Sequence, residues 1–449
     1  MRALFGTKHM VSADAVGEKP EDEESSQGDL PSEGETPPQG LSISASTGKP
    51  IPLLFHEAGG TLTVVDPIAT VTFFSGDGQA AAEAIRAQLR AVVATNPWLG
   101  SRLGMVGPRR VWPGCSAEMR IPEDFAVDSV FLDAGNCGIR PAMTYEEILC
   151  AWRDKQIKPA WQAWIKNSPL FQVAVTSTGP NEFALIVELN HVLGDGDTFY
   201  KVYGMLQPGA EVVAMNPHRK TDFSELMRDF HGGSDHLFIP SMKRSVKPVI
   251  GLVRTLCKRS VRPPRLFRVD SEWLARQKAD APMCSTNDIL TSVLLKTSRA
   301  HYGIMPVNLR DRIPGIECSD VGNYWRPQEI LVDEFQTPPG VRGVVSAATA
   351  VARDSIEQKR DSRRPKLAQV GRIGVVTNWA GFYRQLDLPG CKELVHMPLL
   401  HGGQMSHSHF VIFRPAKDEI AVWCAVRDTR VMAGLENVPM FASSVGRIA

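Results

Sequence analysis

The segment NHVLGDGDT, residues 190–198, has the residue types and the spacing of an acid–base site. It follows the apolar run FALIVEL, residues 183–189, which predicts a buried strand. His191 therefore stands just after a strand end. Because the pKa of histidine lies close to neutral pH, an imidazole in this place can take a proton from an alcohol or an amine. We interpret His191 as a general base. A structural histidine followed by a tight turn is the alternative that this segment leaves open.

Asp195 follows in the same predicted turn, between Gly194 and Gly196. Glycine adopts backbone angles that are closed to other residues, so we expect these two positions to shape the turn. An aspartate here either orients the histidine or holds the loop through an arginine. The spacing alone does not decide between these two roles.

Apolar periodicity and capping residues predict the elements that position this segment. The stretch SGDGQAAAEAIRAQLRAVVATNP predicts a helix that Ser75 or Asp77 caps and that ends at Asn96-Pro97. Further predicted helices cover residues 144–166, 198–206, 286–301 and 341–360. Strands are predicted in LTVVD and ATVTFF, at 171–175 and 183–189, and near 305–309, 372–378, 409–414 and 419–425. Strands that alternate with amphipathic helices indicate α/β layers.

Several motifs in a fixed order resemble the CoA-dependent acyltransferase superfamily, and BAHD acyltransferases in particular. NPWLGSRL (96–103), SPLFQVAV (168–175), HVLGDGD (191–197) and STNDILTSVLLK (285–296) come in the order of that family. MPVNLRDRIP (305–314), VGNY (321–324) and VTNWAGFYRQLDLPG (376–390) follow, although the family's DFGWG is here Asp-Leu-Pro-Gly. Wax ester synthase/diacylglycerol acyltransferases and condensation domains are its other relatives. The resemblance covers about residues 50–430.

The resemblance implies a role for each matching residue. His191 would deprotonate the acceptor, which then attacks the acyl-CoA thioester directly, without a covalent acyl-enzyme. Asp195 would be structural and would form an ion pair with Arg310, with Arg312 as the alternative partner. Gly196 would let the loop pass close to the substrate.

Three further residues are implied as candidates to line the channel or to stabilise the oxyanion: Asn323, Thr377 and Trp379. A developing oxyanion needs a preorganised donor, but the sequence does not identify which residue supplies it.

The resemblance also implies the architecture, an α/β fold of two chloramphenicol-acetyltransferase-like lobes with mixed sheets and a channel between them. We expect a disordered acidic tail over 1–45, because a segment rich in Glu, Asp, Ser, Gly and Pro buries too little apolar surface to fold. The N-terminal lobe is expected over 46–235, a basic crossover linker over 236–270, and the C-terminal lobe over 271–449.

The crossover carries many basic residues and no acidic one from Ser241 to Val269. We take Lys258, Arg259 and Arg262 as candidates for the phosphates of CoA, because a basic cluster at a channel mouth attracts them. A solvated surface is one alternative. An interfacial helix is another, since apolar and basic residues are paired in PVIGLVRTLCKRSV (248–261).

Composition argues against several other classes of protein and of site. The net charge of +1 gives no case for nucleic acid. The eight cysteines form no CxxC pair, and no apolar run is long enough to span a bilayer. Ser406 to His409 alternate serine and histidine, which we interpret as surface or channel-lining residues. No metal site is expected.

We therefore expect a monomeric cytoplasmic enzyme that transfers an acyl group from acyl-CoA to a hydroxyl or amine acceptor. Its co-substrate is acyl-CoA, and no other cofactor is expected. One alternative is a lipid-directed acyltransferase that makes wax or glyceride esters at a membrane surface. The other is a non-catalytic binding protein on the same fold. The sequence does not show the acyl chain, the acceptor, or whether the donor is CoA or a carrier protein.

Overall fold

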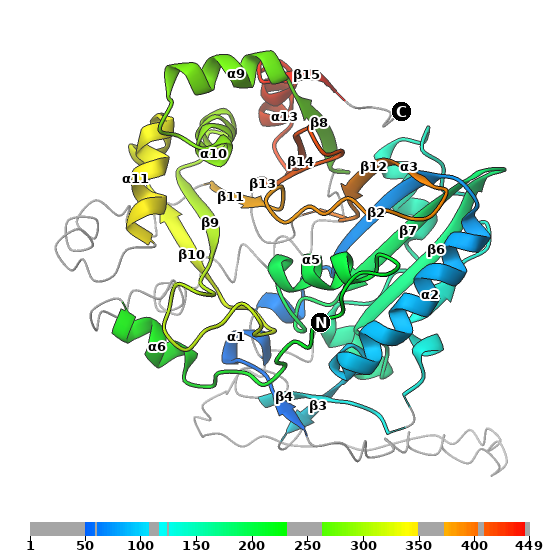
Figure 1. The fold of residues 1–449 in the computed structure, drawn as a ribbon. Coiled ribbons are helices and arrows are strands. Elements are labelled where there is room, and N and C mark those ends of the chain that lie inside the picture. Colours follow the sequence, from blue (N-terminus) through cyan, green and yellow to red (C-terminus); the bar gives the residue numbers. More distant parts are fainter. Residues whose placement is uncertain are drawn as a thin grey trace, which may run out of the picture. The chain divides into compact units, whose positions relative to one another are not determined.

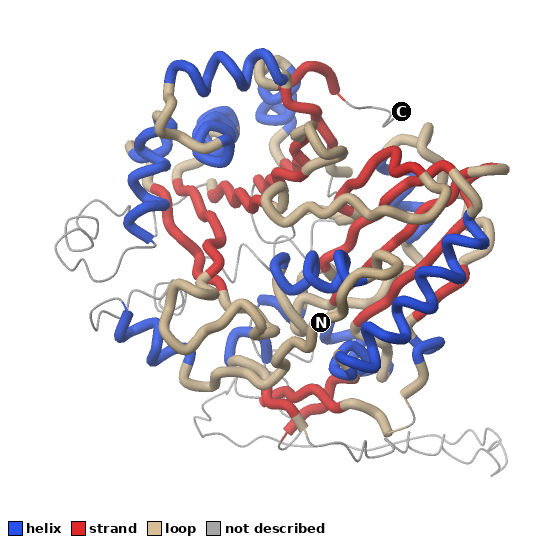
Figure 2. Tube along the Cα trace, viewed as in Figure 1, coloured by secondary structure: helices blue, strands red, loops and turns tan. Residues whose placement is uncertain are grey.

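The computed structural model describes residues 50–58, 61–106, 116–123, 125–230, 263–348, 372–402 and 408–444. The chain divides into two units, Met1–Ala45 and Ser46–Ala449, and the described residues all lie in the second unit. The expected acidic tail at 1–45 is outside the described residues. Figures 1 and 2 show the helices and strands of the described part.

The first lobe is built on a mixed sheet, which has five strands in the described residues, in the order β12-β2-β7-β6-β5. Only β5 and β6 run parallel; the other neighbours are antiparallel. The strands are β2 (Ile68–Ser75), β5 (Phe131–Asp133), β6 (Phe171–Gly179), β7 (Glu182–Leu189) and β12 (Lys392–Pro398). β12 comes from far along the chain and pairs with β2, with Met397 opposite Val71.

Both faces of this sheet are covered by helices. α2 (Gly78–Thr95) begins at Asp77, whose side chain accepts from the backbone of Gln79 and Ala80, and it buries Ile85 and Leu89. α2 and α5 (Gly196–Met205) lie on one face of the sheet, and Figure 1 shows α2 running across β6 and β7. α3 (Tyr145–Trp152) packs on the other face through Trp152.

The second lobe is built on a larger mixed sheet, seven-stranded in the described residues, in the order β10-β9-β11-β13-β14-β8-β15. β11 is parallel to both β9 and β13, and the remaining pairs are antiparallel. Its strands are β8 (Arg265–Val269), β9 (Tyr302–Asn308), β10 (Trp325–Ile330), β11 (Ile373–Asn378), β13 (Ser408–Phe413), β14 (Ala421–Val426) and β15 (Phe441–Ser444).

The two faces of this second sheet belong to different cores. Phe410, Ile412 and Val422 pack in one cluster with residues of α10 (Thr286–Thr297), α11 (Pro338–Ala348) and α13 (Thr429–Glu436). Val411 and Trp423 point the other way and belong to the core cluster of the first lobe. The two lobes therefore share one continuous apolar core, which fixes the second sheet against the first lobe.

Short elements complete the described structure. A small antiparallel sheet has the order β1-β4-β3. The elements are β1 (Ile51–Pro52), α1 (Phe55–Ala58), η2 (Thr61–Thr63), η3 (Pro97–Gly100), β3 (Arg102–Val106), β4 (Ser116–Arg120), η4 (Val127–Ser129), α4 (Ala160–Lys166), α6 (Phe223–Phe230), α9 (Ser271–Asp280) and η5 (Glu334–Gln336). Among the described residues, no helix is both long and apolar enough to cross a membrane.

The expected α/β fold with mixed sheets is confirmed, but two local predictions are wrong. The strand predicted in LTVVD is replaced by η2, and β2 starts only after Pro67. The single helix predicted over 144–166 is broken into α3 and α4, because Pro159 cannot continue a helix and stands at the N-cap of α4.

Two segments also depart from the predicted lobe boundaries. Arg265–Val269, expected in the crossover, is strand β8 of the second sheet. Lys392–Pro398, expected in the C-terminal lobe, is strand β12 of the first sheet.

Candidate active site

The candidate base, His191, lies in a turn that follows β7 directly. Asn190 fixes this turn: its backbone N–H donates to the Leu170 carbonyl at 2.7 Å, and its side-chain amide donates to the Lys158 carbonyl at 2.9 Å. Its side-chain oxygen accepts from the backbone N–H of Val192 at 3.2 Å. His191 is partly buried at the end of the strand.

Asn323 holds the imidazole of His191 from the other lobe. Its Oδ1 lies 3.0 Å from His191 Nδ1, and its Nδ2 donates to the His191 carbonyl at 2.7 Å. The Oδ1 atom also accepts from Trp325 Nε1 at 3.2 Å. Asn323, a candidate channel or oxyanion residue from the sequence, therefore contacts the base itself.

The orientation of the Asn323 amide fixes the tautomer of His191. Asn323 Nδ2 faces two groups that can only accept, the His191 carbonyl and Glu57 Oε1, at 2.7 Å and 2.9 Å. The other amide atom must then be the oxygen, and an oxygen facing Nδ1 requires a proton on Nδ1. His191 Nε2 is thus the unprotonated nitrogen of the neutral ring, and it has no hydrogen-bond partner among the described residues.

A buried carboxylate supports Asn323. Glu57 Oε1 accepts from the backbone N–H and from Nδ2 of Asn323 at 2.8 and 2.9 Å. Glu57 Oε2 accepts from the Leu54 backbone at 3.0 Å and from Arg219 Nε at 2.8 Å. The side chains of Glu57 and Arg219 are both fully buried, so the ion pair they form is shielded from water.

Arg219 ties together the two chain segments that meet at the base. Its Nη2 donates to the carbonyls of Val192 and Leu193 at 3.0 and 2.9 Å, and its Nη1 donates to the Val321 carbonyl at 2.7 Å. Neither Arg219 nor Glu57 is among the site residues predicted from the sequence. Each is a single charged residue outside any motif, and only the fold brings them next to His191.

Asp195 holds the loop rather than the imidazole. Its Oδ2 accepts from Arg310 Nη1 at 2.8 Å, and its Oδ1 accepts from the backbone and the hydroxyl of Thr198 at 3.1 and 3.2 Å. Asp195 is thereby the N-cap of α5. Arg310 is its partner, whereas Arg312 donates to the Asn308 carbonyl.

Arg310 extends from the second lobe to the His191 loop of the first lobe, and its guanidinium donates hydrogen bonds to several oxygens at once. Besides Asp195, its guanidinium donates to the carbonyls of Asp320 and Gly322 at 2.8 and 2.7 Å and to the Thr198 hydroxyl at 3.2 Å. The ring of Tyr324 lies 5.3 Å from its Cζ. The Gly322–Asn323 pair is thus placed from one side by Arg310 and from the other by Glu57.

The glycines of the His191 loop serve close packing rather than unusual backbone angles. Neither Gly194 nor Gly196 has a positive φ, so the expectation that they supply special angles is wrong. A Cβ at Gly194 would come within 2.5 Å of the Thr198 side chain. Gly322 does have a positive φ of 139°, and a Cβ there would meet Arg219 Nε at 2.9 Å.

Trp379 and Thr377 come from the end of β11, on the side of the second sheet that faces the first lobe. Trp379 is buried, and its indole edge packs over Gly196, with Nε1 3.5 Å from where a Cβ would be. The loop at Gly196 therefore passes close to this indole. Thr377 lies two residues earlier in the strand and is partly buried.

Burial sets the protonation state of the base. It lowers the pKa of His191 below the usual histidine value. The opposing, smaller effects come from the backbone carbonyl of His191, from Asp195, from Asn323 and from Glu57, which raise that pKa. The imidazole is therefore neutral at neutral pH, which is the state that a general base requires.

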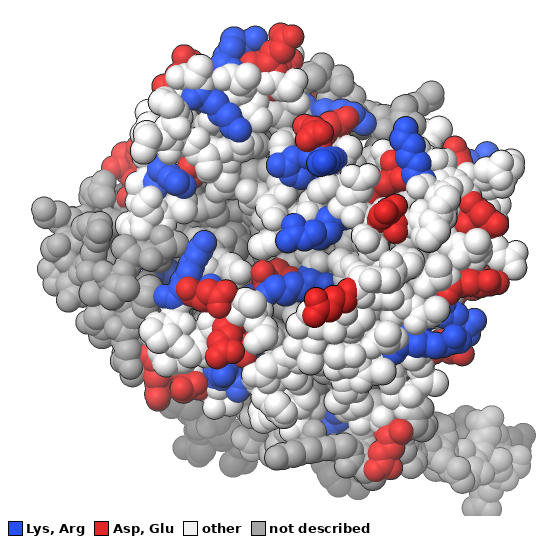
Figure 3. Space-filling model, viewed as in Figure 1, with Lys and Arg blue, Asp and Glu red and all other residues white. Residues whose placement is uncertain are grey.

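The CoA-phosphate candidates Lys258, Arg259 and Arg262 lie outside the described residues. On the face of the described residues that Figure 3 shows, basic and acidic side chains are interspersed. This face shows no cluster of one charge sign that would replace those candidates. Across the described part of the chain, no group of three or more His, Cys, Asp or Glu side chains could hold a metal.

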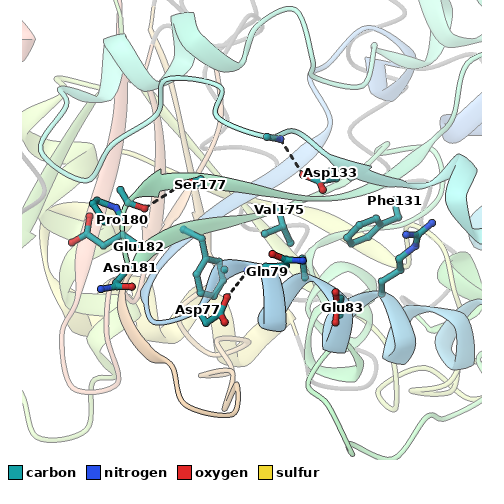
Figure 4. A pocket seen from close by; sticks show the side chains of 16 residues that line it. Asp77, Gln79, Glu83, Phe131, Asp133, Val175, Ser177, Pro180, Asn181 and Glu182 are labelled. Carbon is teal, nitrogen blue, oxygen red and sulfur yellow. Dashed lines mark hydrogen bonds between the residues drawn. The ribbon is translucent and has the colours of Figure 1, made fainter.

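Neither of two surface pockets in the described residues is lined by His191. The first, of about 660 Å³, lies between the start of α2 and the β6–β7 hairpin, and its lining includes Asp77, Gln79 and Glu182 (Figure 4). It is at the opposite end of β7 from His191. The second, of about 310 Å³, lies between α5 and the segment that follows Trp379.

No protein-family model and no curated protein matches the chain. Solved structures do match its fold. Vinorine synthase superposes with a TM-score of 0.58 at 13% identity, over 90% of this chain and 97% of its own. F. sporotrichioides TRI101 complexed with coenzyme A and T-2 gives 0.59 at 12% identity, over 87% and 98%. The first condensation domain of the CDA synthetase gives 0.53 at 15% identity, over 90% and 99%.

These similarities confirm the fold that the ordered motifs predicted. The chain shares the two-lobed α/β fold of these solved structures over most of its length. At 12–15% identity the comparisons show the fold and leave the activity to be argued from the site.

Proposed function

We propose that this protein transfers an acyl group from acyl-CoA to a hydroxyl or amine acceptor, with His191 as the general base. One observation carries the proposal. The Asn323 amide, oriented by Glu57, accepts from Nδ1 of His191 and leaves Nε2 with a free lone pair. A neutral, oriented imidazole with one unengaged nitrogen is the arrangement that general-base catalysis needs.

The reaction follows from this geometry. Nε2 of His191 takes the proton of the acceptor O–H or N–H as that oxygen or nitrogen attacks the thioester carbonyl. The new bond to carbon forms, the carbonyl electrons move to oxygen, and the C–S bond then breaks as they return. The CoA thiolate leaves and takes the proton from the His191 imidazolium. No acyl-enzyme forms, because the acceptor itself is the nucleophile.

The remaining features of the proposal concern the substrates and the setting. Acyl-CoA enters a channel between the lobes, where Lys258, Arg259 and Arg262 meet its phosphates. The coenzyme A bound by TRI101, which shares the fold, supports a CoA donor. The enzyme acts in the cytoplasm as a monomer. The monomer is supported by the fact that one chain supplies both His191 and Asn323.

The test is the release of free CoA thiol from a panel of acyl-CoAs, with separate pools of alcohols, amines and lipid acceptors. Wild type is compared with His191→Ala and with His301→Gln, a control at an exposed histidine. We expect release that needs an acceptor, that falls at least a thousandfold in His191→Ala, and that His301→Gln leaves unchanged.

The outcomes separate the alternatives. Release only with the lipid pool indicates the lipid-directed acyltransferase. Turnover by His191→Ala equal to wild type rejects the general base. Absence of release from every pool rejects acyl-CoA as the donor. Carrier-protein thioesters are then tested as donors. If they do not react either, the non-catalytic binding protein is the remaining alternative.

A further inference from the structure

His409 on β13 lies on the face of the second sheet that packs against the first lobe. Its neighbour Phe410 belongs to the core formed with α10 and α11, whereas Val411 belongs to the core of the first lobe. Side chains alternate along a strand, so His409 shares the face of Val411. Ala425, which pairs with His409 on β14, also belongs to the core of the first lobe.

The same face of the second sheet carries the indole of Trp325, which contacts the Asn323 amide beside His191. His409 is in register with Val375, and Val375 is in register with Ile304 of β9. Asn308 lies on that face too, four residues further along β9, and it pairs with Trp325. The Trp325 indole donates to the amide oxygen that holds the general base. Strand register therefore puts His409 on the side of the sheet that faces His191.

The ring of His409 is held in place by its packing, and its nitrogens make no hydrogen bond within the described part of the chain. It packs edge-on against Trp423, with ring centroids 5.5 Å apart and planes at 86°. His409 is partly buried, and among the described residues neither of its ring nitrogens has a hydrogen-bond partner. Trp423 is itself fixed by a 3.0 Å hydrogen bond to the Tyr145 hydroxyl. His409 is thus a positioned polar group with unused hydrogen-bonding capacity.

His409 carries no charge at neutral pH. Burial and, to a smaller extent, the nearby His191 together lower its pKa to about 4. A neutral imidazole offers one N–H donor without a permanent positive charge, so it does not compete with protonation of the base.

Thr377 lies beside His409 on the same face. Val375 is opposite His409, and Thr377 is the next residue on that side of β11. Because β11 and β13 are neighbouring strands, the two side chains can reach one atom from two directions. The Thr377 hydroxyl also has no hydrogen-bond partner among the described residues.

Resting on the acyl transfer proposed above, we propose that His409 donates a hydrogen bond to the carbonyl oxygen of the acyl thioester. Thr377 donates to the same oxygen from the adjacent strand. As the acceptor attacks, the carbonyl π electrons move onto this oxygen, and the two donors stabilise the negative charge that develops there. When the C–S bond breaks, the electrons return and the charge leaves with the thiolate.

This assignment divides the chemistry between the lobes. His191, from the first lobe, removes the proton of the acceptor. His409 and Thr377, from the second sheet, stabilise the negative charge that develops on the oxygen of the acyl carbonyl. Neither nucleophile nor leaving group needs to touch His409, so its loss should affect the chemical step rather than the binding of the substrates.

The experiment measures kcat and KM for CoA release by the full chain. His409→Phe keeps the ring and its packing on Trp423 but removes the N–H, so we expect kcat to fall about 10²–10³-fold. KM for either substrate should stay within threefold. His409→Gln, which restores an N–H, should recover at least tenfold, and His301→Gln should match wild type.

A double-mutant cycle tests the pairing. Thr377→Val should lower kcat less than His409→Phe. The double variant should show less than the product of the two single effects, because two donors to one oxygen act as a unit.

Two results would overturn this inference while the proposed function stands. If wild type turns over and His191→Ala does not, then a His409→Phe variant with unchanged kcat makes His409 only a wall of the channel. A change confined to KM makes it a ground-state binding residue. Absence of turnover by wild type overturns both proposals together.

Discussion

At the scale of single residues, the feature that decides the chemistry is an amide rather than a carboxylate next to the base. Asn323 Oδ1 accepts from His191 Nδ1 without adding a negative charge, so burial can keep the pKa of His191 low. The two carboxylates that raise the pKa of His191, Glu57 and Asp195, form ion pairs with Arg219 and Arg310. The base therefore stays neutral, and its free nitrogen stays available.

The first prediction concerns Asn323→Leu. Loss of the amide removes both the anchor of the ring and a hydrogen bond that raises the pKa of His191. We expect kcat to fall about 10–100-fold, which corresponds to roughly 1.4–2.8 kcal/mol. The acid limb of the kcat/KM profile should move to lower pH. Steady-state kinetics between pH 4.5 and 8 measure both effects.

The control for this variant is Asn181→Leu, at an exposed asparagine in the β6–β7 turn. It should leave kcat and the pH profile unchanged. An acid limb that moves to higher pH in Asn323→Leu would contradict the assigned orientation of the amide.

The second prediction concerns the fully buried pair of Glu57 and Arg219. Glu57→Gln removes one partner and leaves a buried guanidinium without its counter-charge, which costs about 3–5 kcal/mol of unfolding free energy. Asp128→Asn breaks the exposed pair with Arg86 and should cost at most about 1 kcal/mol. Urea denaturation compares the two, and equal losses would show that burial of the first pair is incomplete.

Site residues that stand in an ordered motif could be predicted from the sequence. Site residues that come together only through contacts in the folded chain could not. His191, Asp195 and Arg310 stand in segments whose order resembles a known family, so they could be named before the fold. Glu57 and Arg219 could not, because a lone Glu and a lone Arg carry no spacing signal. Their 2.8 Å contact joins positions far apart in the chain.

At the scale of elements, the loop from β7 to α5 is fixed by its helix cap and by the other lobe. Asp195 caps α5 and also accepts a hydrogen bond from Arg310, which in turn donates to the Gly322 carbonyl. The Asp195 side chain therefore fixes both the start of the helix and its position relative to Gly322. The geometry of the base therefore depends on a junction between lobes.

The third prediction tests this junction with Arg310→Lys. A lysine cannot reproduce the forked donors that reach Asp195, Thr198 and Gly322. We expect a loss of about 2–4 kcal/mol in unfolding free energy and a lower kcat. Arg312→Lys, at an exposed position, should change neither quantity. Similar losses in the two variants would show that Arg310 does not hold the loop.

Elements with a strong local signal were predictable, and those defined by distant partners were not. The capped, amphipathic α2 and the apolar strands β6 and β7 follow from the sequence alone. β12 does not, because Lys392–Pro398 becomes a strand of the first sheet only by pairing with β2. The proline that separates α3 from α4 was visible, yet helical periodicity on both sides concealed the break.

At the scale of the whole molecule, β12 also carries a buried histidine that links the sheet to α5. His396 Nδ1 lies 2.8 Å from the Thr72 hydroxyl, and its Nε2 lies 3.0 Å from the Tyr200 hydroxyl. Burial lowers the pKa of His396 to about 3. The folded protein therefore keeps this ring neutral far below the pH at which an unfolded chain protonates it.

The fourth prediction follows from this difference. Because the folded-state pKa lies below the unfolded value of about 6.5, the unfolded state binds more protons between these two values. Stability then falls as the pH is lowered through this window. Protonation of His396 in the unfolded state should lower the unfolding free energy by about 2 kcal/mol between pH 7 and pH 5. In His396→Gln that difference should shrink by about this amount, as measured by denaturant unfolding at both pH values.

His301→Gln, at an exposed histidine, is the control and should leave the pH difference as it is in wild type. An unchanged pH difference in His396→Gln would show that the ring is protonated in the folded protein.

The place of β12 in the first sheet also has a consequence for synthesis of the protein. The ribosome makes β2 and its neighbours long before Lys392–Pro398, so the nascent first lobe exposes the unpaired edge of β2 in the meantime. Such an edge invites pairing with other nascent chains, which makes chaperone protection valuable during translation. A separately expressed first lobe would keep that open edge permanently unless it also carried Lys392–Pro398.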